Sequence, residues 1–508
     1  MSQDISSDPA PEVTSQPLKI LLLAAEVVPF AKTGGLADVT GSLPPAIRAL
    51  GHDIRVAMPR YGRIRPARFG LKRLPGRITV PLDHRSETAQ LLHTTLANQT
   101  PIYFVESARY FEREGIYMYP DDAERFIFFC RAALEGMRQV VGWQPDIIHC
   151  HDWHTALVPN WLKTVYARDP FFANAASVYT IHSLGYRGIF GRRVLEIAGI
   201  AEYEFVASPH QMDASQVVDF MARGITFADV ITTVSPTYAR EILTPEWGEQ
   251  LDGLLRSRKD RLFGILNGID TSEYDPARDP YLDTPYNIEQ LERRPANKLA
   301  LQREAGLCQD ARVPLIGYIG RLTDQKGLDL IVAIIENLLR YAGVQLVLLG
   351  TGEQRYHDFF LDLARRYHDQ VGVFLTFNTS LARRIYAGSD IFLMPSRFEP
   401  CGLGQMIAMR YGSIPLVRAV GGLADTVMDY NPANDQGTGF LFGDYDPMLL
   451  YTTVVRAVET YRHSQVWRGL QVRAMQQDFS WAASARQYID VYYRTRAFRQ
   501  AEALVQQV

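Results

Sequence analysis

The chain has few cysteines, and their spacing gives no sign of pairing. Four occur in 508 residues, at Cys130, Cys150, Cys308 and Cys401, and no two form a Cys-x-x-Cys motif. Neither a disulfide framework nor a zinc site follows from such scattered thiols. The simplest interpretation is a protein of the reducing cytoplasm.

The chain also lacks a long apolar run and an excess of charge of either sign. No stretch approaches the roughly 20 apolar residues of a membrane helix, and residues 1–17 lack the basic start and apolar core of a secretion signal. We expect those residues to form a disordered tail. Lys and Arg number 53 against 56 Asp and Glu, for a net charge of -3. This balance argues against bulk nucleic-acid binding.

Neither standard phosphate-binding motif is present, although a glycine-bearing loop follows the first apolar run. In KTGGLADV (residues 32–39) Lys32 precedes the glycines, whereas a P-loop places it after them, and Gly34 and Gly35 are adjacent, unlike those of a dinucleotide fold. Backbone N–H groups at a helix start favour anions. From these residues alone, an anion site and a plain tight turn both remain open.

Short apolar runs alternate with stretches of helical periodicity along most of the chain. This pattern predicts an α/β protein with parallel sheets. It is interrupted by a segment rich in Pro, Asp and Tyr at residues 271–294 and then restarts. We therefore expect two doubly wound, Rossmann-like domains, residues 18–262 and 263–480, facing a central cleft. A final helix at 481–508 follows them.

The second domain has a loop with two cations at the end of a predicted strand. Arg321 and Lys326 lie between Gly320 and Gly327. A bidentate Arg fork and a compact Lys charge suit a diphosphate, although a solvated loop has the same composition. With Lys32 from the other domain, three cations can converge on one anion.

One carboxylate, Glu399, stands just ahead of a predicted helix at 405–411. It could be a helix cap, or it could bind sugar hydroxyls and oppose positive charge on a sugar carbon. Nearby Cys401 is interpreted as a small buried residue rather than a nucleophile.

Histidines follow two of the predicted strands. His149, His151 and His154 surround Asp152, but no further ligand cluster supports a metal, so no metal is predicted. His182, after the next strand, is either a core residue or a donor in the cleft.

Six motifs in order resemble those of bacterial glycogen synthases and plant starch synthases, retaining glucosyltransferases of the GT-B fold. The resemblance covers essentially residues 18–493. The motifs are KTGGLADV (32–39), HDWHTA (151–156), NGID (267–270), GRLTDQKG (320–327), SRFEPCGL (396–403) and GGLADT (421–426).

The resemblance implies transfer of glucose from ADP-glucose to the non-reducing end of an α-1,4-glucan such as glycogen or a maltooligosaccharide, with release of ADP. No cofactor or metal is implied. It assigns catalytic roles to four residues: Glu399, Arg321, Lys326 and His182. It assigns contacts with ADP-glucose to nine others: Lys32, Gly35, Asp152, Asn267, Phe377, Cys401, Gly402, Leu403 and Thr426.

Some positions depart from the family pattern. Ser183 follows His182 where Asn is usual, and Phe377 stands where a base-stacking Tyr is frequent. Donor choice is the property these changes affect, so a UDP-glucose enzyme, or one that makes another glucoside, is an alternative. A third alternative is a glucan-binding protein with a dead site, against which the intact cations and Glu399 argue. The oligomeric state is left open.

Overall fold

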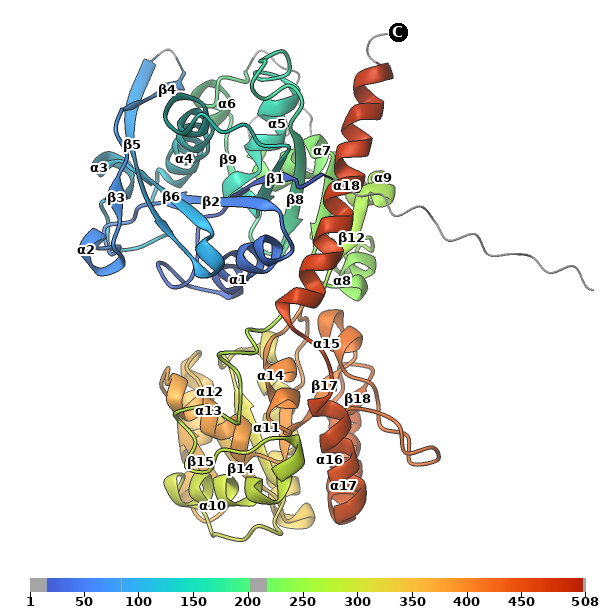
Figure 1. Ribbon diagram of the computed structural model, residues 1–508. Coiled ribbons are helices and arrows are strands. Elements are labelled where there is room, and N and C mark those ends of the chain that lie inside the picture. The colour runs from blue at the N-terminus through green and yellow to red at the C-terminus, as the bar shows by residue number, and fades with distance from the viewer. Residues whose placement is uncertain (1–15, 84, 202–216, 506–508) are drawn as a thin grey trace, which may run out of the picture.

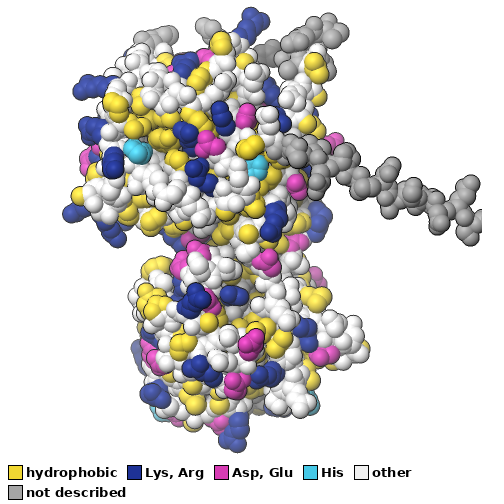
Figure 2. Space-filling model, in the orientation of Figure 1, with side chains coloured by type: hydrophobic (Ala, Val, Ile, Leu, Met, Phe, Trp, Pro, Cys, Tyr) yellow, Lys and Arg dark blue, Asp and Glu magenta, His cyan; other side chains and the backbone are white. Residues whose placement is uncertain are grey.

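A computed structural model describes residues 16–83, 85–201 and 217–505, and its core is two separate sheets (Figure 1). The part built on the sheet that begins the chain is here called the first unit, and the part built on the other sheet the second unit. Figure 2 shows the two units meeting at a narrowed waist.

The first unit has a ten-stranded sheet that is parallel over its central strands. Its order is β12 (Leu262–Gly264), β11 (Val230–Thr233), β8 (Ala176–Ile181), β7 (Ile147–His151), β1 (Lys19–Leu23), β2 (Asp53–Pro59), β6 (Pro101–Glu106), β5 (Arg85–Thr95) and β3 (Lys72–Arg73), with β4 (Ile78–Leu82) paired to β5. Strands β7 and β8 are buried along their whole length, as expected of parallel strands covered on both faces.

The second unit has a six-stranded sheet, and all its strand pairs are parallel. Its order is β15 (Val371–Phe374), β14 (Gln345–Leu349), β13 (Leu315–Ile319), β16 (Ile391–Met394), β17 (Ile414–Arg418) and β18 (Phe440–Phe442). A separate two-stranded ribbon of the first unit pairs β9 (Ile189–Gly191) with β10 (Val217–Asp219).

Helices connect most of these strands. Those of the first unit are α1 (Gly35–Ala49), α2 (Pro66–Phe69), α3 (Ala108–Phe111), α4 (Asp122–Gly136), α5 (Leu157–Lys163), α6 (Val194–Ile197), α7 (Phe220–Phe227), α8 (Pro236–Glu241) and α9 (Asp252–Ser257). Those of the second unit are α10 (Arg294–Glu304), α11 (Leu328–Asn337), α12 (Gln354–Arg366), α13 (Thr379–Gly388), α14 (Gly404–Arg410), α15 (Gly421–Thr426), α16 (Pro447–Tyr461) and α17 (Ser464–Met475).

The last helix, α18 (Trp481–Val505), returns to the first unit, where it packs against α1 and β8 (Figure 1). The two connections between the units run side by side, because the Ile269 N–H donates to the Phe479 carbonyl at 2.8 Å. A Cβ on Gly268 would lie 2.7 Å from the backbone nitrogen of Trp481. The glycine therefore lets these two connections approach closely.

Strand order places a reversal point in each sheet. In the first sheet the chain goes from β1 outward to β2 and β6, and it then continues from β7 to β8 and β11 on the other side. In the second sheet β14 and β15 lie on one side of β13, while β16 and β17 lie on the other. Ligands of open parallel sheets bind where the strand order reverses. The loops after β1, β7, β13 and β16 are therefore the expected site.

The prediction of parallel sheets needed correction for the first unit. The sheet of the first unit is not wholly parallel, because β3, β4 and β5 add an antiparallel edge. The final helix, predicted at 481–508, is α18 (Trp481–Val505), and residues 506–508 lie outside the described residues. Most of the predicted tail, residues 1–15, lies outside the described residues. None of the described helices has the length and hydropathy needed to cross a bilayer.

Candidate active site

The reversal point of the second sheet brings a lysine and a carboxylate together. Lys326 follows β13 and Glu399 follows β16, and Lys326 Nζ lies 2.5 Å from Glu399 Oε2. Gly327 makes this loop possible, since its φ is +76° and a Cβ there would lie 2.1 Å from the Pro395 carbonyl oxygen. The pair joins a candidate phosphate ligand to a candidate sugar ligand.

Glu399 is held in place by its neighbours. Only 8% of the residue is exposed, and the Ser396 hydroxyl donates to the same carboxylate oxygen at 3.1 Å. Its carbonyl accepts the Gly422 N–H at 3.2 Å, and a Cβ on Gly421 would lie 2.0 Å from that carbonyl oxygen. The Gly421–Gly422 pair therefore serves close packing of α15 against the Glu399 segment.

The loop between Glu399 and α14 contains backbone N–H groups that are not hydrogen-bonded to any described residue. The N–H groups of Gly402 and Leu403 have no hydrogen-bond partner among the described residues. Burial raises the pKa of the Cys401 thiol to about 12, so this thiol is neutral at pH 7 and is no nucleophile. The side chain of Gln405 donates to the Cys401 carbonyl at 3.1 Å and to the Thr426 hydroxyl at 3.1 Å. Thr426 thus lies behind the loop and braces it.

The reversal point of the first sheet brings Asp152 and His182 together. The His182 N–H donates to Asp152 Oδ1 at 2.8 Å. Asp152 has a φ of +54°, a conformation that costs energy for any residue other than glycine and that clusters at functional sites. Burial raises the pKa of the Asp152 carboxyl to about 7, although the N–H groups of His182 and Ser183 oppose the shift.

The histidines here form an uncharged group, in which His149, His151 and His154 are buried and His182 is partly exposed. Burial lowers the pKa of His149, His154 and His182 to about 3 in each case. His149 and His151 lie on one face of β7, as predicted, with ring centroids 4.1 Å apart. Across the described residues, no three His, Cys, Asp or Glu side chains are arranged to hold a metal ion.

In the KTGG loop a side chain of the protein itself occupies two backbone amides. The N–H groups of Thr33 and Gly34 donate to the buried carboxylate of Glu26, which also accepts the Thr33 hydroxyl at 2.6 Å. The Tyr117 hydroxyl donates to it as well, at 2.6 Å. Sequence reasoning missed Glu26. A charged residue directly after the apolar run that ends at Ala25 was the signal that could have revealed it.

The remaining predicted residues lie on both units. Lys32 Nζ pairs with Asp38 at 2.6 Å, and within the described part of the chain it forms no hydrogen bond or ion pair with the second unit. Exposed Arg321 donates to Gln325 at 2.9 Å. Gly35 opens α1, Phe377 is 91% exposed, and buried Asn267 has an amide oxygen with no partner among the described residues. Among the described residues, Lys32 and Arg321 thus share no hydrogen-bond or ion-pair partner.

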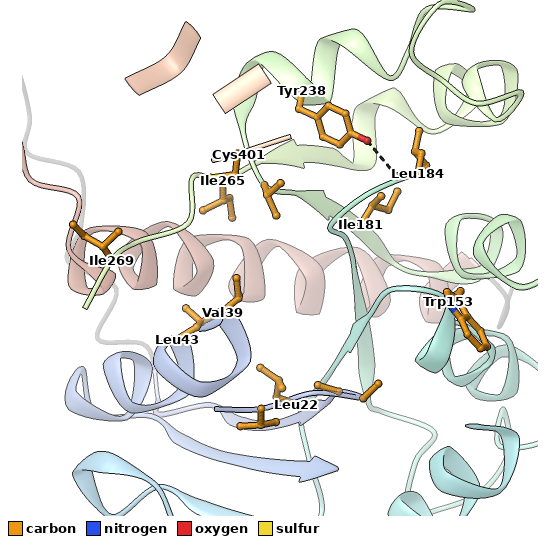
Figure 3. Packing of buried hydrophobic residues seen from close by; sticks show 14 of the residues in the cluster. Leu22, Val39, Leu43, Trp153, Ile181, Leu184, Tyr238, Ile265, Ile269 and Cys401 are labelled. Atoms are coloured by element: carbon orange, nitrogen blue, oxygen red, sulfur yellow. Dashed lines mark hydrogen bonds between the residues drawn. The ribbon is translucent and has the colours of Figure 1, made fainter. Parts of the chain in front are cut away.

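The two units contact each other beside this site. In α8, the Thr237 N–H and hydroxyl both donate to the Asp425 carboxylate of α15 at 2.7 Å. The hydroxyl of Tyr238 accepts the N–H of Leu184, two residues after His182, at 3.2 Å (Figure 3). Helix α8 therefore links the His182 segment to the second unit.

Comparison with known proteins assigns both units. Residues 19–257 match the starch synthase catalytic domain, and residues 308–468 match the glycosyl transferases group 1 domain. A glycogen synthase of Desulforudis audaxviator is 48% identical, over 94% of this chain and 96% of that relative. One of Moorella thermoacetica is 48% identical, over 96% and 99%. The chain belongs to the glycogen and starch synthase family of glycosyltransferases.

Solved structures place this family member in the GT-B fold. The catalytic domain of starch synthase IV from Arabidopsis thaliana, solved with ADP and acarbose bound, matches with a TM-score of 0.86 at 35% identity, over 95% of this chain and 100% of that domain. A sucrose-phosphate synthase from Thermosynechococcus elongatus matches with a TM-score of 0.57 at 18% identity, a likeness of fold alone. The expected fold of two Rossmann-like domains is confirmed.

Proposed function

We propose that this family member is a glycogen synthase, which transfers glucose from ADP-glucose to the non-reducing end of an α-1,4-glucan with retention of configuration. The observation that carries the proposal is the Lys326–Glu399 pair at the reversal point of the second sheet. Its relatives are glycogen synthases, and the starch synthase IV domain was solved with ADP. We place residues 18–262 on the acceptor side and 263–480 on the donor side, with 481–508 crossing back.

Charge separation in the transition state decides the roles of the residues. As the bond between the sugar and the diphosphate breaks, negative charge grows on ADP and positive charge on the sugar ring. Preorganised charges aimed at those positions lower the barrier. We assign Arg321 and Lys326 to the diphosphate, and Glu399 to the sugar. Lys32 joins the diphosphate ligands when the units close.

The glucose pocket draws on both units. We assign Asp152, His182 and the amide oxygen of Asn267 to the sugar hydroxyls. Asp152 and His182 meet at the reversal point of the first sheet, and the Asn267 oxygen has no partner among the described residues. The free N–H groups of Gly402 and Leu403 suit a phosphate or hydroxyl oxygen. Gly35 offers close approach at the start of α1, and Phe377 offers an exposed ring to the base.

A cation set of this kind neutralises the leaving group without a metal, so we propose a metal-independent reaction. In the retaining route the acceptor hydroxyl attacks the face that ADP leaves, and a leaving phosphate oxygen takes its proton. The four unpaired cysteines support the cytoplasmic location expected from the sequence.

The test is the turnover of ADP-glucose and of UDP-glucose with glycogen as acceptor, in the presence of EDTA. We expect ADP release matched by growth of the α-1,4-glucan, with ADP-glucose the better donor. A strong preference for UDP-glucose would overturn the donor assignment. Binding of glycogen with no release of either nucleotide would overturn the assignment as an enzyme.

A further inference from the structure

His151 contacts the candidate site through a single ring nitrogen. His151 Nδ1 lies 2.9 Å from His182 Nε2, and the His151 residue is fully buried. His182 is partly exposed, and its second ring nitrogen, Nδ1, has no partner among the described residues. His151 therefore engages one ring nitrogen of His182 and leaves the other available to a ligand.

Both rings are neutral at pH 7, so one of the two facing nitrogens carries a proton and the other accepts it. The pKa of each ring lies well below its ordinary value because of burial. If His182 donated from Nε2, His151 would carry its proton on its own Nε2. That atom is buried and meets no acceptor in the described chain. Orphaned buried N–H groups are rare in proteins, and under-satisfied acceptors are less so.

We propose that His151 is a positioning residue that donates from Nδ1 to His182 Nε2 and so fixes His182 as the tautomer with its proton on Nδ1. His182 then presents an N–H donor to the sugar rather than an acceptor. This inference rests on the proposed function for the identity of the ligand. The tautomer itself does not depend on that function.

The surroundings of His151 hold its ring in place. Its backbone N–H donates to the Thr155 hydroxyl at 2.6 Å, which in turn donates to the His151 carbonyl at 2.9 Å. Its ring packs on His149, whose ring nitrogens bond the Tyr492 hydroxyl of α18 at 2.9 Å and the Thr180 hydroxyl at 2.6 Å. Helix α18 thus supports His149, and His149 in turn supports the ring of His151.

Asp152 completes the hold on His182 from the same segment. Asp152 accepts the backbone N–H of His182 at 2.8 Å, while His151 engages its ring. Two consecutive residues of one strand end therefore fix both the backbone and the ring of His182. The hydrogen bond made by one ring nitrogen determines which tautomer a histidine adopts.

The test is nitrogen NMR of the full chain labelled at histidine, with the His182 signals assigned from their loss in His182→Gln. We expect the wild-type Nδ1 of His182 to show the shift of a protonated ring nitrogen and Nε2 that of an unprotonated one. In His151→Phe the ring should move towards the Nε2–H form that histidine prefers in water. His151→Asn, whose amide N–H stands near the position of Nδ1, should retain the wild-type signature. His154→Phe is the matched control and should leave it unchanged.

Steady-state kinetics give a second test of the proposal. His151→Phe should lower kcat/KM for ADP-glucose about tenfold, the size of one lost hydrogen bond, and it should add no further loss in a His182→Ala background. An Nε2–H tautomer in the wild type, or one unchanged in His151→Phe, would overturn the proposal. The spectrum needs no turnover, so a chain that is inactive as a synthase still gives a decisive result. If His151→Phe does not fold, the wild-type spectrum alone decides.

Discussion

Lys326 and Glu399 form a direct ion pair, with Lys326 Nζ 2.5 Å from Glu399 Oε2, although 73 residues separate them in the chain. In this arrangement the cation that we assign to a phosphate and the carboxylate that we assign to a sugar neutralise each other. Binding of ADP-glucose would give each of them a new partner. The ion pair thus holds both side chains in place at the site, and the substrate must break it in order to bind to either one.

The first prediction follows from that exchange. Glu399→Gln should leave ADP binding as tight as in the wild type or tighter, because Lys326 loses its competing carboxylate, while turnover falls by at least about 10²-fold. Calorimetric titration with ADP and steady-state rates measure the two effects. Weaker ADP binding together with normal turnover would reverse the assigned roles.

The second prediction concerns Lys32. Since Lys32 pairs with Asp38 and forms no hydrogen bond or ion pair with the described residues of the second unit, Lys32→Ala should chiefly raise KM for ADP-glucose, by about tenfold, and change kcat little. Lys259→Ala, which removes an exposed lysine of the first unit, is the matched control and should leave KM unchanged. A fall in kcat alone would place Lys32 in the chemical step.

The third prediction concerns Glu26, whose carboxylate accepts the amides of Thr33 and Gly34. In Glu26→Gln the side-chain NH2 group can face the N–H groups of Thr33 and Gly34, which are donors too. The change should therefore destabilise the protein by about 1–3 kcal/mol. Hydrogen exchange should quicken at residues 32–35. The exposed control Glu114→Gln should show neither effect. Unchanged exchange at these amides would mean that Glu26 does not order the loop.

The fourth prediction concerns acid. Burial lowers the pKa of His149, His154 and His182 to about 3, and lowers that of His151 as well, so unfolding takes up protons below pH 6.5. His149, His154 and His182 should each reduce the free energy of unfolding by about 1.4 kcal/mol per pH unit as pH falls from 6.5 towards 3, and His151 should act in the same direction. Asp152 acts in the opposite sense, because its raised pKa stabilises the folded state at low pH and this contribution is lost as pH rises from 3.8 to about 7.

Melting temperatures measured between pH 7 and pH 5 test these signs. The wild type should melt lower at pH 5, His154→Phe should show a smaller fall, and Asp152→Asn a larger one. A melting temperature that rises on acidification would show that the histidines are not buried in neutral form.

The sequence predicted the strand framework well where strands are continuously apolar. Strands β16 and β13 are examples of the predicted short apolar runs, because a strand buried on both faces has no polar interruption. The antiparallel edge was missed because β4 alternates buried and exposed residues. Such a strand is weakly apolar, and its pairing depends on a partner along the sheet.

The site was predictable in its residue types but not in its pairings. Motif order identified Lys326, Glu399, Asp152 and His182, and the structure places them after the carboxyl ends of β13, β16, β7 and β8. The sequence did not predict that the Glu26 carboxylate accepts the amides of the glycine loop, because this contact depends on how the chain turns after β1. The bond between His151 and His182 likewise depends on the register of β7 and β8. Such relationships need three-dimensional coordinates.

The central claim is that Lys326 and Glu399 act as one unit in glucosyl transfer. The most direct measurement is the rate of glucose transfer from ADP-glucose to glycogen in Lys326→Ala, Glu399→Gln and the double variant. We predict that each single change lowers turnover by at least about 10²-fold and that the double variant is no slower than the slower single, because residues that act together are not additive. A near-normal rate in either single variant, or losses that multiply in the double variant, would contradict the account.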